Sequence, residues 1–219
     1  VAMVAHGFPS TIHATVDMMC THTAAVRRGA PELFVLADMP FLSVRRGLAA
    51  ATEAAGALMQ AGATAVKIEG VTGHEDVIAH LVGSGIPVMG HLGLTPQSVH
   101  QFGGYRLQGR SVDDAERVAR EAAKLESLGA FAVVLECVPE ALAETITRAR
   151  AIPTIGIGAG AETSGQVLVL SDLLGLDAQF QPRFVRRYLD GHDVVRDAIN
   201  GFVRDVRAAK FPAREEVLG

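Results

Sequence analysis

The feature that most constrains the fold of this chain is a repeated alternation of two kinds of segment. Short apolar runs rich in Val and Ile alternate with longer segments of helical periodicity, and Gly, Pro or Asp stands at nearly every junction. The runs are almost wholly apolar, which is typical of parallel strands that are covered on both faces. Six or more such units favour a (β/α)8 barrel over an open, doubly wound sheet.

The apolar runs predict six strands, at residues 32–38, 63–69, 86–91, 130–136, 152–158 and 166–170. The intervening segments predict helices at residues 47–61, 74–84, 112–128, 139–149 and 192–208. The chain also opens with a strand-like VAMVAHG. Because 219 residues with 49% hydrophobic content can bury one sizeable core, we expect a single barrel domain over residues 1–219.

Composition argues against several classes of partner. The 20 basic and 24 acidic residues give a formal charge of -4, and no basic run suggests a nucleic-acid partner. The chain has neither an apolar run of the roughly 20 residues that span a membrane nor the pattern of a signal peptide, so we expect no membrane partner and a cytoplasmic location. Cys20 and Cys137 lack CxxC spacing, which argues against a zinc knuckle or disulfide scaffold.

Four of the apolar runs end in a titratable residue, namely Asp38, Glu69, His91 and Glu136. In a parallel barrel the carboxyl ends of all strands meet at one rim, so we expect these side chains to converge there. Lys67 shares a strand face with Glu69, because side chains repeat every two residues. Two buried charges would cost several kcal/mol each in a sealed core, so the rim is where we expect them.

Taken singly, most of these residues also have a structural explanation. Asp38 precedes Met-Pro and suits a turn, Lys67 and Glu69 suit an ion pair, and His91 suits a hydrogen-bonded core histidine. Glu136 is hardest to explain in this way, because it follows five apolar residues. Two carboxylates without Cys or His at ligand spacing point to a hard cation, Mg²⁺ before Zn²⁺, held by Asp38 with Glu69 nearby.

Three further segments allow two interpretations each. Residues 90–111 are long and irregular, as in a lid or binding segment, although an exposed insertion is the alternative. Residues 155–166 contain four glycines, which suit either a phosphate cradle or close backbone packing. The helix predicted at 192–208 has one apolar face, and we favour its packing on the barrel's own wall over docking on a neighbouring subunit.

The stretches VLADMPF, AVKIEG, GIPVMGHLGLTPQSVHQFGGYRLQGR, GAFAVVLECVP and IPTIGIGAG resemble the ketopantoate hydroxymethyltransferase family, in that family's order. The similarity runs from about residue 7 to 215. It implies a barrel of the phosphoenolpyruvate mutase/isocitrate lyase type, Mg²⁺, and homo-oligomers that are often decameric in bacteria. The implied reaction moves the one-carbon unit of 5,10-methylenetetrahydrofolate onto 3-methyl-2-oxobutanoate, giving ketopantoate for pantothenate biosynthesis.

The resemblance also implies a role for each rim residue. Asp38 corresponds to a metal and substrate ligand, and Glu69 to a group beside the metal. Lys67 corresponds to the residue that meets the carboxylate of the keto acid, and His91 lines the substrate site. Glu136 corresponds to the general base that removes a proton from C3 of the substrate while Mg²⁺ stabilises the enolate.

The resemblance is incomplete at the N-terminus. Family members carry an additional segment with a Gly-Asp-Ser whose Asp is the other metal ligand, and nothing in this sequence matches it. We expect that segment to lie upstream of Val1, because a barrel without its opening strands would expose unpaired edges. The alternatives are a divergent copy with an impaired metal site and another lyase of the same barrel type that acts on keto acids.

Overall fold

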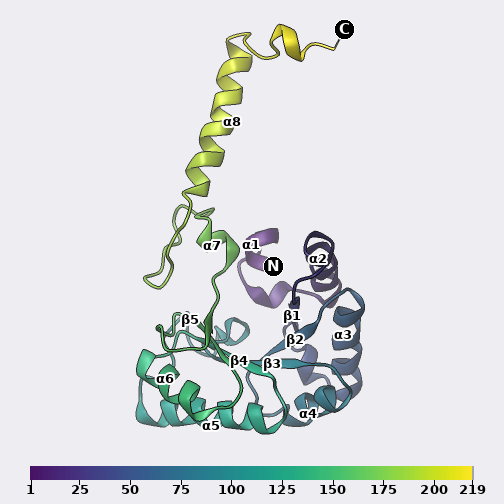
Figure 1. Cartoon of the computed structure of the whole chain (residues 1–219), viewed down its shortest axis with the longest axis vertical. Coiled ribbons are helices and arrows are strands. Elements are labelled where there is room, and N and C mark those ends of the chain that lie inside the picture. The colour runs from purple at the N-terminus through teal and green to yellow at the C-terminus, as the bar shows by residue number, and fades with distance from the viewer. Residues whose placement is uncertain (219) are drawn as a thin grey trace. The chain divides into compact units, whose positions relative to one another are not determined.

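The computed structural model describes residues 1–218, which form two compact units divided after Val167 (Figure 1). The first unit runs from Val1 to Val167, and the second begins at Leu168. The single domain over residues 1–219 stays a prediction.

The first unit is built on one parallel sheet of six strands, which pair in chain order. This sequential order is that of a barrel wall, in which each strand lies beside the next one along the chain. Five of the six predicted strands lie where the apolar runs placed them. The strands are β1 (Leu36–Asp38), β2 (Ala65–Glu69), β3 (Val88–Gly93), β4 (Ala132–Glu136), β5 (Thr154–Ile157) and β6 (Gly165–Gln166).

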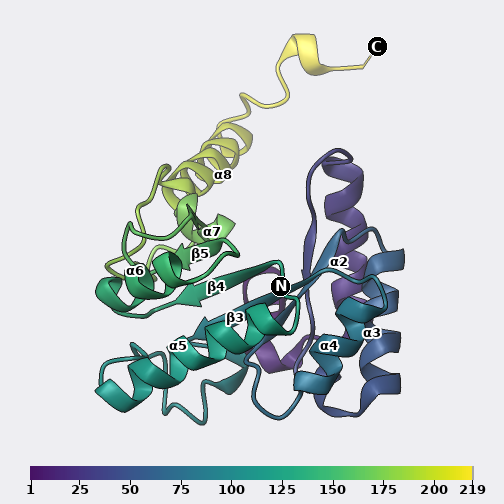
Figure 2. The same cartoon turned by 60° about the horizontal axis from the view of Figure 1, so that its bottom comes forward.

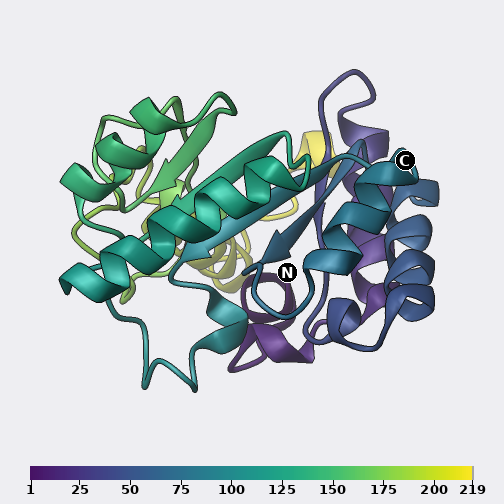
Figure 3. The same cartoon turned by 90° about the horizontal axis from the view of Figure 1, so that it is seen from below.

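Helices lie along one face of this sheet (Figures 2 and 3). The predicted helices of this unit are confirmed as α3 (Leu48–Gln60), α4 (Glu75–Gly83), α5 (Val112–Ser127) and α6 (Glu140–Ala149). A further helix, α2 (Val16–Gly29), was not predicted. Its start does carry a sequence signal, because the Thr15 side chain caps it by accepting a hydrogen bond from the Met18 backbone N–H at 3.1 Å.

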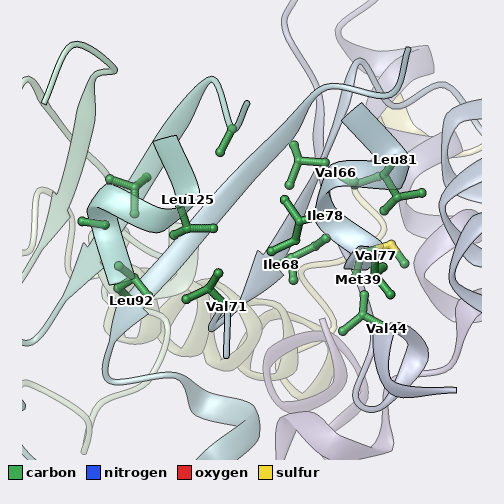
Figure 4. Close-up of a cluster of buried hydrophobic side chains, with 14 of the residues drawn as sticks. Met39, Val44, Val66, Ile68, Val71, Val77, Ile78, Leu81, Leu92 and Leu125 are labelled. Atoms are coloured by element: carbon green, nitrogen blue, oxygen red, sulfur yellow. The ribbon is translucent and has the colours of Figure 1, made fainter. Parts of the chain in front are cut away.

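The core lies between the sheet and the helices, where apolar side chains from both meet (Figure 4). Alternate residues of β2, Val66 and Ile68, are fully buried in this cluster. Leu125 of α5 lies so close to β3 that a Cβ atom at Gly90 would come within 2.3 Å of its Cδ1. Glycine at position 90 therefore lets α5 pack directly against the sheet.

Two expected strands are wrong. The opening VAMVAHG contains the short helix α1 (Ala2–His6), which Gly7 ends in a left-handed conformation with φ 70°. The run at 166–170 pairs as a strand only at its start, and Leu170 begins the short helix α7 (Leu170–Leu173). Both runs are short and apolar, and periodicity alone cannot distinguish a strand from a helix in such runs.

The glycine-rich segment at 155–166 shows close packing. A Cβ atom at Gly156 would lie 2.6 Å from the Thr163 hydroxyl, and one at Gly160 would lie 2.4 Å from the Glu140 side chain. Glu140 also accepts a hydrogen bond from the Ala161 backbone N–H at 3.0 Å. These contacts favour close backbone packing as the explanation of the glycines.

The second unit contains α7 and α8 (Gly191–Arg207), which confirms the predicted final helix, and the short turn η4 (Arg214–Glu216). The loop before α8 is held by Arg187, whose Nη2 donates to the carbonyl oxygens of Asp177 and Phe180 at 2.7 and 3.1 Å. The apolar residues of α8 are about half exposed, so the surface that covers them stays a prediction. None of the helices in residues 1–218 is long and apolar enough to cross a lipid bilayer.

Candidate active site at the strand tips

The tips of β1 and β2 bring Asp38 and Lys67 together as neighbours in the sheet register. The Lys67 ammonium contacts Asp38 Oδ1 in an ion pair, with the lysine side chain only 16% exposed. Burial by itself would lower the pKa of Lys67, but Asp38 and Glu69 outweigh it and raise that pKa above its ordinary value. Lys67 is therefore a firmly charged ammonium among three carboxylates, since Glu136 also acts on it.

The next strand, β3, places His91 opposite Glu69. Lys67 Nζ lies 3.3 Å from His91 Nδ1, and His91 Nε2 lies 3.1 Å from Glu136 Oε2. An ammonium group only donates, so Nδ1 is the acceptor and the ring proton is on Nε2, the nitrogen nearer to Glu136. Burial, followed by the charge of Lys67, holds the pKa of His91 well below its usual range, so the ring is neutral at physiological pH.

Both glutamates at the rim have strongly raised pKa values. Burial is the largest cause for each and outweighs the opposing effect of Lys67, so that the pKa of Glu69 and that of Glu136 both rise to about 7. A carboxyl group with a pKa near the working pH can both take and return a proton, which suits a general base. Such perturbed groups gather at functional sites more often than elsewhere.

One contact at this rim was not anticipated from the sequence. The backbone N–H of Gln97 donates to Glu69 Oε2 at 2.9 Å, and the Gln97 side chain donates from Nε2 to the Met39 carbonyl at 2.9 Å. The irregular segment at 90–111 was noted as a candidate binding segment, but nothing in its composition singles out Gln97. The contact depends on the loop after β3 folding back over the tips of β1 and β2.

The structure brings all five predicted site residues into one continuous set of contacts. The carboxylate of Asp38 meets Lys67, Lys67 meets His91, and His91 lies between Glu69 and Glu136, at 3.9 and 3.1 Å. Lys67 forms its ion pair between strands, with Asp38. A pair of Lys67 with Glu69 within β2 was the structural alternative. The assigned roles of these residues in substrate, metal and proton binding stay predictions.

The donor set fits Mg²⁺. Asp38 Oδ1 is buried and, within residues 1–218, has no aligned hydrogen-bond partner despite its contact with Lys67. Mg²⁺ in enzymes typically takes one or two carboxylates and completes its coordination with water and substrate oxygens. The described residues contain no group of three or more His, Cys, Asp or Glu side chains that could hold a metal. Asp38 and Glu69 as ligands, in a set completed by water and substrate oxygens, stay a prediction.

Comparison with known proteins agrees with this arrangement. The chain is 51% identical over 215 residues to 3-methyl-2-oxobutanoate hydroxymethyltransferase of Bdellovibrio bacteriovorus, covering 98% of this chain and 82% of that protein. It is also similar in structure to 2,3-dimethylmalate lyase, a member of the PEP mutase/isocitrate lyase superfamily. That match has a TM-score of 0.59 and 16% identity over 99% of this chain and 76% of the other.

A second solved structure, phosphonopyruvate hydrolase in complex with oxalate and Mg²⁺, matches with a TM-score of 0.59 and 10% identity over the same shares, 99% and 76%. These likenesses show the fold, an α/β parallel sheet that forms part of a barrel of the PEP mutase/isocitrate lyase type, as predicted. The family model described as ketopantoate hydroxymethyltransferase matches residues 1–214. On that match and on the identity to its relative, the chain belongs to the ketopantoate hydroxymethyltransferase family.

Proposed function

We propose that this protein transfers the one-carbon unit of 5,10-methylenetetrahydrofolate to C3 of 3-methyl-2-oxobutanoate, giving ketopantoate, with Mg²⁺ as its metal. The observation that carries the proposal is the single contact network of Asp38, Lys67, Glu69, His91 and Glu136 at the strand tips. The family and the named relative support the reaction. The cytoplasm as its location and a homo-oligomer as its assembly stay predictions.

The charge distribution supports a position for the substrate. The Lys67 ammonium is the cation available to the carboxylate of a keto acid, because His91 beside it is neutral. Asp38 and Glu69 would hold Mg²⁺, and when bound the ion would stabilise the negative charge that develops on the keto oxygen. The protein thus supplies one cation for the carboxylate and two anions for the metal.

Glu136 is the group suited to take the proton from C3. Its pKa of about 7 leaves a substantial fraction ionised at physiological pH. The ring of His91 limits the positions open to Glu136 Oε2, because Nε2 lies 3.1 Å from that oxygen. Once Glu136 has taken the proton, the electron pair left at C3 would form the new carbon–carbon bond to the methylene carbon of the folate. That carbon gives up its bonds to the two folate nitrogens, which take up protons, and water supplies the hydroxyl group. Tetrahydrofolate then leaves with ketopantoate as the product.

The first half of this reaction can be tested without folate. The full-length protein should exchange the C3 proton of 3-methyl-2-oxobutanoate for deuterium, and exchange should stop with EDTA and resume with Mg²⁺. With 5,10-methylenetetrahydrofolate added, ketopantoate should form. NMR of the substrate in D₂O measures the exchange, and mass spectrometry measures the product.

Other results would select the alternatives. Exchange without ketopantoate formation would indicate an impaired copy that keeps only the proton-transfer step. Absence of exchange, together with cleavage of a substituted malate, would indicate a lyase of the kind that shares this fold. Either outcome would contradict the proposed transferase activity.

A further inference from the structure

Gln97 follows strand β3 and forms hydrogen bonds at the tips of the two preceding strands, β1 and β2. It lies in the loop after β3, in the single turn η3 (Pro96–Ser98), yet it donates to Glu69 at the end of β2 and to the carbonyl of Met39 just beyond β1. The strand order is β1-β2-β3, so Gln97 reaches across β2 to the far strand. No other residue described here forms hydrogen bonds to both tips.

We propose that Gln97 is a positioning residue that fixes the separation of the Asp38 and Glu69 carboxylates. The inference rests on the proposed function, in which these two side chains hold the metal. The Met39 carbonyl belongs to the peptide between Met39 and Pro40, one residue beyond Asp38, so the bond to it restrains the chain just after Asp38. The bond to Glu69 Oε2 fixes the other carboxylate from the same residue.

The turn that carries Gln97 is well suited to this task. Pro96 occupies its first position, where the ring restricts the backbone. The Ser98 N–H donates to the carbonyl of Thr95 at 2.8 Å, and Thr95 is only 6% exposed. Gln97 is itself half-buried, and the hydrogen bond to the Met39 carbonyl fixes its side-chain amide.

Loss of the Gln97 amide should affect the metal more than the keto acid. Mg²⁺ requires nearly ideal octahedral geometry, so a small change in carboxylate separation weakens its binding. Lys67, which we assign to the keto-acid carboxylate, has no hydrogen bond to Gln97 among the described contacts. A misplacement of about 1 Å costs on the order of 100-fold in rate, and a smaller shift correspondingly less.

The test compares Gln97→Met with Gln101→Met in the full-length protein. Methionine has about the length of glutamine but no amide, and Gln101 is an exposed residue of the same loop. Three quantities are measured: C3 exchange kinetics with Mg²⁺, retention of Mn²⁺ by electron paramagnetic resonance, and the thermal midpoint in EDTA. We expect Gln97→Met to lower kcat about 10-fold and weaken Mn²⁺ binding about 10-fold, with KM for the keto acid and the EDTA midpoint little changed.

Gln101→Met should match the wild type in all three. If Gln97→Met does not fold, Gln97→Asn replaces it, because its shorter amide cannot reach the Met39 carbonyl from the same backbone position. Wild-type Mn²⁺ retention and kcat in either folded variant would overturn the inference. So would a fall in the EDTA midpoint that accounts for the whole loss of activity.

The proposed function fails separately. If the wild type exchanges no proton but retains Mn²⁺, the transferase proposal is wrong, while weaker Mn²⁺ retention by Gln97→Met still supports the positioning role. If the wild type retains no Mn²⁺ either, both are overturned.

Discussion

The two ends of strand β2 differ in the surroundings of their charged side chains. Just before the strand begins, Arg27 of α2 donates to the carbonyl of Gly62 at 2.8 Å and to the Thr64 hydroxyl at 2.9 Å. The same guanidinium donates to the carbonyls of Pro31 and Leu33, both at 2.8 Å. Four of its five N–H groups thus donate to neutral acceptors.

At the other end of β2, Lys67 and Glu69 lie among further ionisable groups. There, two glutamates have pKa values of about 7, and His91 Nε2 has no aligned partner within residues 1–218. Unsatisfied and perturbed groups of this kind cost stability and are retained where chemistry needs them. We infer that the start of the strand serves stability and that its tip serves the reaction.

The largest effect is expected for Glu136→Gln, at the tip of β4, which tests whether the strand tips serve the reaction. Removal of the proposed general base should lower the C3 exchange rate by roughly 100- to 10,000-fold, while the thermal midpoint at pH 8 should not fall. NMR exchange assays and thermal unfolding measure the two. Glu53→Gln, at an exposed position of α3, is the matched control and should change neither. A Glu136→Gln variant with the wild-type rate would remove Glu136 from the mechanism.

A substitution in the core should have the opposite effect, lowering stability and leaving activity unchanged. Leu125→Ala removes a fully buried side chain beside Gly90 and should lower the free energy of unfolding by about 2 to 5 kcal/mol. The exchange rate per folded molecule should stay near the wild-type value. Val112→Ala, at the 75% exposed start of the same helix, should change stability by less than about 0.5 kcal/mol. Urea unfolding measures both, and similar effects at the two positions would contradict the packing described.

The raised pKa of Glu136 predicts how stability depends on pH. Between its ordinary value of 4.5 and about 7, the folded protein holds this proton more tightly than the unfolded chain. Stability from this group is therefore present below pH 4.5 and is lost as the pH rises through about 7, by up to about 3 kcal/mol. Glu136→Gln has no such proton and does not lose this stability. The unfolding free energy of the variant should therefore rise relative to that of the wild type between pH 5 and pH 8. Parallel curves would show that Glu136 titrates normally.

The smallest effect is expected at the start of β2. Arg27→Lys keeps the charge but loses the planar fork that serves four acceptors, and should cost about 1 kcal/mol of stability. Activity per folded molecule should not change, because Arg27 lies at the opposite end of the strand. Arg28→Lys, at the exposed neighbour, is the control for the same substitution in urea unfolding. A loss of activity in Arg27→Lys without loss of stability would break the division between the two ends.

Much of this architecture could be predicted from the sequence, because it depends on local patterns. The apolar runs that became β1 to β5 have the lengths of strands, and Gly, Pro or Asp stands at most of their ends. The titratable residues at 38, 69, 91 and 136 were recognisable as strand-tip groups, because a parallel sheet brings such ends to one edge. The runs at 1–7 and 166–170 were assigned wrongly, because short apolar runs suit helix and strand alike.

What the sequence determined by itself is thus the parallel α/β fold, its elements and the set of charged residues at the strand tips. Only the tertiary structure decided how those residues pair: Lys67 with Asp38 across two strands, His91 between two glutamates, and Gln97 over the tips of β1 and β2. The physical reason is that a strand's side-chain period fixes which face a residue occupies. The distance between groups on different strands depends instead on register and loop path.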